Sequence, residues 1–105
     1  MERQQFLYKL KLIEKLTDEK NWTKKEDETV SRHFQYLQNL LNEKKLILAG
    51  KTKGLDTATF GIVIFESDSE EGALSIMNGD PAVKEGVMTA ELFPYQVALM
   101  GDLRS

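Results

Sequence analysis

The sequence contains no cysteine, and this absence removes several kinds of site at once. Without thiols the chain forms no disulfide, holds no thiolate-bound metal and uses no cysteine nucleophile. It also lacks any apolar run approaching the ~18 residues that a membrane span requires, so no membrane association is expected. Residues 1–5 lead straight into a strand-like segment and do not resemble a cleavable signal peptide. A cytoplasmic protein is therefore expected.

The chain also has no excess of basic charge, since its formal net charge is −3. Lysines and acidic residues are interspersed, notably over residues 15–28. Nucleic-acid binding depends largely on neutralising phosphates, so no nucleic-acid partner is expected. The chain has a single histidine, whereas a metal site needs more than one histidine or a clustered set of carboxylates. The glycines form no phosphate-binding loop. We therefore expect neither a metal nor another cofactor.

Alternating and continuous apolar segments predict four strands in a chain whose length fits one domain over residues 1–105. In the first strand Phe6 and every second residue after it share one face, as in a half-buried strand. Pro94 indicates that part of the last strand lies at a sheet edge, since proline cannot donate to a ladder. The four predicted strands are residues 6–13, 46–49, 60–65 and 88–99.

A helix is predicted after the first strand. Thr23 and Glu26 have the spacing of a capping box, with Thr23 as the N-cap. Apolar residues then recur at steps of four, three and four, which places them in one stripe, and the helix ends near residue 44 or 45. The polar stretch 14–22 before it is expected to be a loop. The residues of the stripe are Val30, Phe34, Leu37 and Leu41, with Leu40 at its edge.

A second helix is predicted between the last two strands. Residues 67–69 offer several N-cap candidates, and Glu70 and Glu71 suit a first helical turn. Residues 78–79, Asn-Gly, end this helix. The following Asp80-Pro81 starts another short helical turn, because proline is favoured at the first helical position.

The predicted order β-α-β-β-α-β is that of an α+β, ferredoxin-like domain with an antiparallel four-stranded sheet. Two helices can cover only one face of this sheet. Phe60, Ile62 and Ile64 nevertheless point to one face, while Val63 and Phe65 point to the other. Leaving either set in water would expose an unusually large apolar patch. A second copy packed face to face, giving a homodimer, is therefore expected.

His33 and Asp80 are the residues best suited to chemistry, and each has two interpretations. His33 lies at the border of the apolar stripe; it is either a packed boundary residue or a general acid or base, since imidazole titrates near neutrality. Asp80 is either an N-cap that accepts backbone N–H bonds or, in addition, the carboxylate that orients His33. The two residues are 47 positions apart in sequence, so only the fold can bring them together.

Two aromatic residues also have two interpretations. Trp22 and Tyr36 either flank a pocket or complete the core, and large aromatic side chains in small domains are more often core residues.

Two parts of the sequence show a pattern typical of a known family. The first part, residues 33–41 and 45–50, has a helical histidine, a leucine-rich half-turn and a short strand that ends in Ala-Gly. Residues 78–87, Asn-Gly-Asp-Pro-Ala-Val-Lys-Glu-Gly-Val, carry a second signature, in which Asp-Pro is followed by an apolar residue and a glycine. In their order and spacing these stretches resemble the YciI-like (YCII-related) family. One departure is Lys51, which follows Ala-Gly where the family commonly has a proline.

The resemblance implies a dimeric α/β barrel built from two ferredoxin-like subunits, and an active site with a histidine–aspartate dyad that matches His33 and Asp80. The wider superfamily includes lactone isomerases, dehalogenating enzymes and small monooxygenases acting on aromatic compounds. The first functional hypothesis is thus an isomerase-, lyase- or dehalogenase-type enzyme that performs acid–base chemistry on a small aromatic or lactone-like substrate, with Tyr8 and Arg32 as further pocket residues. The alternative is a non-catalytic homodimer that binds a small molecule or has a regulatory role.

Overall fold

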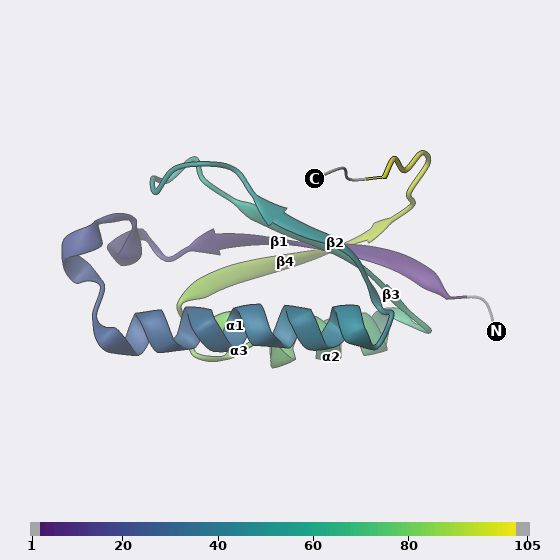
Figure 1. The fold of residues 1–105 in the computed structure, drawn as a ribbon, viewed down its shortest axis with the longest axis horizontal. Helices are drawn as coiled ribbons and strands as arrows, with labels where there is room; N and C mark the ends of the chain where they lie inside the picture. The colour runs from purple at the N-terminus through teal and green to yellow at the C-terminus, as the bar shows by residue number, and fades with distance from the viewer. Residues whose placement is uncertain (1–2, 103–105) are drawn as a thin grey trace.

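The computed structural model describes residues 3–102 and shows a four-stranded sheet with its helices gathered on one side (Figure 1). The strands are β1 (Gln4–Leu12), β2 (Leu46–Lys51), β3 (Gly61–Ser67) and β4 (Met88–Tyr95). The α-helices are α1 (Lys24–Asn42), α2 (Glu70–Gly79) and α3 (Pro81–Lys84). Two 3-10 helices, η1 (Glu14–Thr17) and η2 (Glu19–Asn21), lie between β1 and α1.

The sheet has the order β2-β3-β1-β4, and all of its neighbouring strands are antiparallel. The predicted α+β, ferredoxin-like arrangement is therefore confirmed. β1 and β3 form the centre, where Tyr8 lies opposite Val63. β4 pairs with β1 alone among the strands, so Pro94 lies in an edge strand as predicted.

The core lies between the sheet and the helices. Alternate residues of β1 and β3 point toward α1 and α2, because successive side chains of a strand point to opposite faces. Phe65 packs edge-on against Tyr8, with ring centroids 5.6 Å apart, and is tilted against Phe6 at 6.1 Å. The buried side chains of this core are Phe6, Tyr8, Leu10, Leu37, Leu40, Val63, Phe65, Ala73 and Met77.

Helix α1 begins as predicted but packs through a different face. Thr23 is the N-cap, and the capping box with Glu26 is complete. Within the predicted stripe, however, Phe34 is 69% exposed and Leu41 is 50% exposed, while Leu40 is only 6% exposed. The reason is that α3 packs against the side of α1 that carries Thr29, which is fully buried. The buried face keeps Leu37 of the predicted stripe, at 8% exposure, but is rotated toward Leu40 at the edge of that stripe.

Two segments differ from the sequence-based expectation. Residues 14–22 are not a simple loop, because η1 buries Leu16 to 2% exposure and the Trp22 indole N–H donates to the Leu16 carbonyl at 2.7 Å. β4 ends at Tyr95 and not at Leu99. Within residues 3–102 no helix combines the length and the apolar character that a bilayer crossing demands.

The face of the sheet away from the helices is partly open. Ile64 is only 4% exposed in the single chain, but three apolar residues around it on the same face remain accessible. These are Leu48 at 49%, Phe93 at 39% and Tyr95 at 43% exposure. The segment after β4 lies on this side of the sheet (Figure 1).

Candidate functional site

Asp80 lies at the junction of α2 and α3 and is fully buried. Its backbone N–H donates to the Met77 carbonyl at the end of α2. Its side-chain Oδ1 accepts the backbone N–H of Ala82 at 3.0 Å, which caps the start of α3. Pro81 occupies the first turn of α3, as its fixed φ favours. The predicted N-cap role of Asp80 is therefore seen in the structure.

The fold also brings His33 to this carboxylate. His33 Nδ1 lies 2.7 Å from Asp80 Oδ1 and 2.9 Å from Oδ2. The Tyr8 hydroxyl donates to Oδ2 at 2.8 Å from the other side. Asp80 thus has donors from β1, α1 and α3, and hydrogen bonds to the ionised form stabilise a carboxylate that burial would otherwise penalise.

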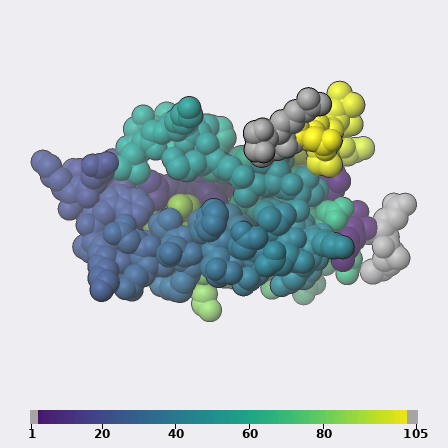
Figure 2. All heavy atoms as spheres, in the orientation of Figure 1, coloured from purple at the N-terminus to yellow at the C-terminus, as the bar shows by residue number. Residues whose placement is uncertain are grey.

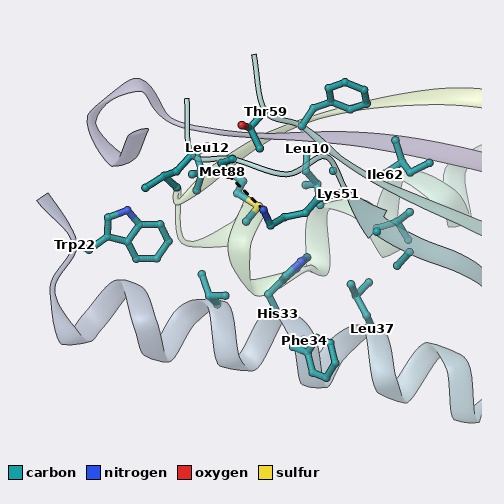
Figure 3. A pocket seen from close by; sticks show the side chains of 18 residues that line it. Leu10, Leu12, Trp22, His33, Phe34, Leu37, Lys51, Thr59, Ile62 and Met88 are labelled. Carbon is teal, nitrogen blue, oxygen red and sulfur yellow. Dashed lines mark hydrogen bonds between the residues drawn. The ribbon is translucent and has the colours of Figure 1, made fainter. Parts of the chain in front are cut away.

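The contact with Asp80 fixes how the His33 ring is protonated. An ionised carboxylate only accepts hydrogen bonds, so Nδ1 carries the proton that it donates to Asp80. In the neutral ring Nε2 then has an available lone pair. No hydrogen bond joins Nε2 to any residue within 3–102, and Figure 3 shows the ring directed into a cavity. Nε2 is therefore placed to exchange a proton with a molecule in that cavity.

Tyr8 lies behind Asp80 and does not line the cavity. Burial raises the pKa of the Tyr8 hydroxyl far above its ordinary value, and the nearby charge of Asp80 and the hydrogen bond to it raise the pKa further. Tyr8 consequently remains a protonated donor at neutral pH. Tyr8 therefore affects the site only through its hydrogen bond to Asp80.

Arg32, which was expected in the pocket, points away from the cavity and pairs with Glu85. Its guanidinium donates to both carboxylate oxygens, with Nη2 2.8 Å from Oε1, and Thr29 also donates to Oε1 at 3.0 Å. The pKa of Glu85 is lowered to about 2, chiefly by the hydrogen bond from Arg32 and also by the Thr29 hydrogen bond and the Arg32 charge. This pair ties α1 to the end of α3, the two elements that carry His33 and Asp80.

A cavity of about 430 Å³ opens in front of His33, in the size range of small-molecule sites. Figure 2 shows it as a hollow between α1 and the connection from β2 to β3. His33, Lys51 and Thr59 are the polar side chains that line it with the indole of Trp22, and no aspartate or glutamate does. Among residues 3–102, no three His, Cys, Asp or Glu side chains group as metal ligands do. The apolar residues that line it are Leu10, Leu12, Val30, Phe34, Leu37, Ala49, Leu55, Phe60, Ile62, Val63 and Met88. Of these, Ile62 pairs with Lys9 on the opposite face of the sheet, and the Phe60 ring lies 4.9 Å from the Lys9 ammonium.

The sequence did not identify most of this wall. Trp22 lines the cavity, whereas its core interpretation had been favoured, and the stretch 14–22 that carries it looked like a polar loop. Tyr36 packs against the core and donates to the Ile76 carbonyl at 2.7 Å. Lys51 was not predicted to line a pocket, although the sequence shows it as a departure from the family pattern. Its place in the cavity follows from the hairpin between β2 and β3, which has no periodic sequence signal.

Comparisons with known proteins place this fold and site in context. Residues 11–95 match the model of the YCII-related domain. No curated protein matches the chain. Two solved structures are similar in fold. One is the 5-chloro-2-hydroxyhydroquinone dehydrochlorinase TftG of Burkholderia phenoliruptrix AC1100 in complex with 2,5-dihydroxybenzoquinone, with 20% identity over 88% of this chain and 93% of that one, and a TM-score of 0.58. The other is the uncharacterized protein TM1266 of Thermotoga maritima, with 7% identity over 90% and 100% of the two chains, and a TM-score of 0.57.

Proposed function

The chain belongs to the YCII-related domain family, and on that premise we propose that it is an enzyme in which His33 moves a proton to or from a small aromatic or lactone-like substrate bound in the cavity. One observation carries this proposal. His33 Nδ1 is held by the buried carboxylate of Asp80 at 2.7 Å, while the rest of the ring faces a largely apolar cavity. A base of this kind contributes typically about 10²–10⁴-fold to a rate.

The proton transfer can be written for two reaction types. In an elimination, Nε2 of His33 takes a proton from the substrate, the electron pair of the broken bond forms a new double bond, and the leaving group departs with its own bonding pair. In an isomerisation, the same nitrogen returns the proton to a different atom of the substrate. After the elimination, His33 gives the proton to the leaving group or to solvent. In both reactions Asp80 stabilises the imidazolium that exists until the proton is given up, as the orienting carboxylate of a catalytic triad does.

The walls of the cavity favour a flat, largely apolar substrate. Trp22 and Phe34 contribute aromatic surface, and most of the remaining lining is aliphatic. Rings pack well against such walls, and the few polar groups would set the orientation of the bound molecule. The dehydrochlorinase of similar fold was solved with a dihydroxybenzoquinone. Hydroxylated aromatic rings, halogenated or not, are therefore the first compounds to screen, followed by lactones.

The experiment compares turnover by the unsubstituted protein and by His33→Ala across this panel. We expect turnover of at least one compound class and a loss of about 10²–10⁴-fold in His33→Ala. The matched control is Glu28→Ala, which removes an exposed charged residue of α1 that does not line the cavity. Turnover that survives His33→Ala would overturn the role of His33. Saturable binding of a compound with no chemical change would favour the non-catalytic alternative.

We also propose that the chain works as a homodimer through the open face of the sheet. Leu48, Phe93 and Tyr95 expose apolar surface there, and the same face carries Lys9 and Glu91 at paired positions. A two-fold interface brings the same patch of each copy together, so apolar residues meet and opposite charges can approach across the axis.

Light scattering tests the homodimer. We expect a mass of two chains for the unsubstituted protein and of one chain for Phe93→Glu. Leu74→Glu is the matched control, because Leu74 is 40% exposed, nearly as much as Phe93 at 39%, but lies on α2. A monomeric unsubstituted protein, or loss of the dimer in both variants, would contradict this interface.

A further inference from the structure

We propose that Lys51 makes the cavity selective for ligands that carry a negatively charged oxygen on a small ring, a carboxylate or a phenolate, which Lys51 binds while the ring lies against the apolar wall. This inference rests on the cavity of the proposed function and deepens it by naming the charge of the ligand. It does not require that the protein be a catalyst.

The contacts of Lys51 leave its ammonium group able to bind an anion. Its Nζ donates to the carbonyl oxygens of Thr52 at 3.2 Å and of Gly54 at 3.4 Å. An ammonium group has three N–H donors, so these two contacts leave one. The salt bridges within residues 3–102 do not include Lys51, whose positive charge is therefore not matched by a carboxylate of the chain.

The acids nearest to this part of the site are occupied elsewhere. Asp56, on the same connection, accepts from the Ala58 backbone N–H at 2.9 Å and from the Thr59 hydroxyl at 3.1 Å. Asp80 lies behind His33, fully buried, and takes its hydrogen bonds from Tyr8, His33 and Ala82. Because no aspartate or glutamate lines the cavity, a ligand inside it meets positive charge from Lys51 and no fixed negative charge.

The position of Lys51 relative to His33 gives the bound molecule an orientation. In Figure 3 the His33 ring rises from α1, while the Lys51 side chain reaches into the cavity from the opposite wall, at the end of β2. A ring bound between them would place its charged oxygen at Lys51 and another of its atoms at His33. Charge interactions strengthen where apolar walls reduce the local dielectric constant, so the same ammonium group would also stabilise negative charge that develops on that oxygen when His33 removes a proton.

The test measures binding of two probes of nearly the same shape, benzoate and benzamide, by isothermal titration calorimetry at neutral pH. We expect the unsubstituted protein to bind benzoate about tenfold or more tightly than benzamide, since a charge-assisted hydrogen bond carries an effect of this order. Lys51→Met should remove this preference and leave the affinity for benzamide unchanged. Lys53→Met is the matched control, because Lys53 lies on the same connection but does not line the cavity, and it should retain the preference.

Several results would overturn the inference. They are an unsubstituted protein that binds no benzoate or does not prefer it, equal weakening of both probes by Lys51→Met, and equal loss of preference in Lys53→Met. Unchanged urea unfolding of Lys51→Met shows that a lost preference reflects the side chain and not the fold. His33→Ala separates this inference from the proposed function, because the preference for benzoate should persist in that variant. Charge selectivity without any turnover would refute the enzyme alone, and turnover without charge selectivity would refute the role of Lys51 alone.

Discussion

The two walls of the cavity are built in opposite ways. Behind His33, Asp80 and Tyr8 are fully buried, and within residues 3–102 no buried side-chain nitrogen or oxygen lacks a hydrogen-bond partner. The facing wall is the exposed connection between β2 and β3, where Lys51 donates only to backbone carbonyls of its own loop.

This difference separates residues that the fold depends on, behind His33, from residues that can be replaced without loss of the fold, in the loop. The buried wall couples three elements through one carboxylate, so a change there affects stability and the position of His33 together. The loop wall contributes little to the core, so a change there alters ligand preference while the fold persists. The predictions below test this division, starting with the buried wall.

The largest expected effect is that of Asp80→Ala. This change leaves the Tyr8 hydroxyl, the His33 Nδ1–H and the Ala82 N–H without their acceptor. Removing one member of such a buried charged network destabilises by about 3–5 kcal/mol. Urea unfolding at pH 7 would measure the loss, which we expect to be accompanied by loss of any turnover.

The matched control for Asp80→Ala is Ser69→Ala. Ser69 caps α2 as Asp80 caps α3, accepting the Gly72 N–H at 3.0 Å, but it is exposed. Loss of such a cap costs about 1 kcal/mol. Equal destabilisation of the two variants would mean that Asp80 acts only as a helix cap and that its hydrogen bonds with Tyr8 and His33 add no stability.

An intermediate effect is expected for Tyr8→Phe, which removes only the donor to Asp80 Oδ2. We expect a loss of about 2 kcal/mol at pH 7. Because the pKa of Tyr8 is raised in the folded state, its stabilising contribution is complete below the ordinary tyrosine value of 10.0 and declines above it, where the unfolded chain ionises. The difference between the two proteins should therefore shrink at alkaline pH.

Urea unfolding as a function of pH checks this behaviour. A pH-independent difference between Tyr8→Phe and the unsubstituted protein would mean that the folded state does not raise the pKa of the Tyr8 hydroxyl. Tyr36, whose pKa is also raised by burial, is present in both proteins and does not affect the comparison.

The fold was largely predictable from the sequence because its elements have strong local signals. The alternation beginning at Phe6 and the capping box at Thr23 depend on near neighbours in the chain, and the structure confirms both. Phe34 and Leu41 were assigned to the buried face and are exposed, because the face that a helix buries also depends on what packs beside it. Here that is α3, a four-residue helix far away in sequence.

The site was predictable only in part. The residue types of His33 and Asp80 indicated acid–base chemistry, but their contact joins positions 47 apart and needs the whole fold. Tyr8 was expected in the pocket and instead lies behind Asp80, since β1 directs it toward the helices. Lys51 and Trp22 lie in or beside loops, where side-chain direction follows from turn geometry that composition does not encode.

The smallest expected effect concerns the Arg32–Glu85 pair, which fastens the buried wall from outside. The pKa of Glu85 is lowered to about 2 from an ordinary value of 4.5. A lowered pKa means that the stabilising contribution is present above pH 4.5 and is lost as the pH falls toward 2. Glu85→Gln should therefore be less stable than the unsubstituted protein at neutral pH, and the free energies of unfolding of the two proteins should become equal in acid.

The difference in free energy of unfolding should be small and should shrink with added salt, because Arg32 is half exposed. Glu19→Gln, an exposed acid on η2, is the control and should show no such convergence. A Glu85→Gln effect as large as that of Asp80→Ala would contradict the division, since an exposed pair would then hold the site as firmly as the buried carboxylate.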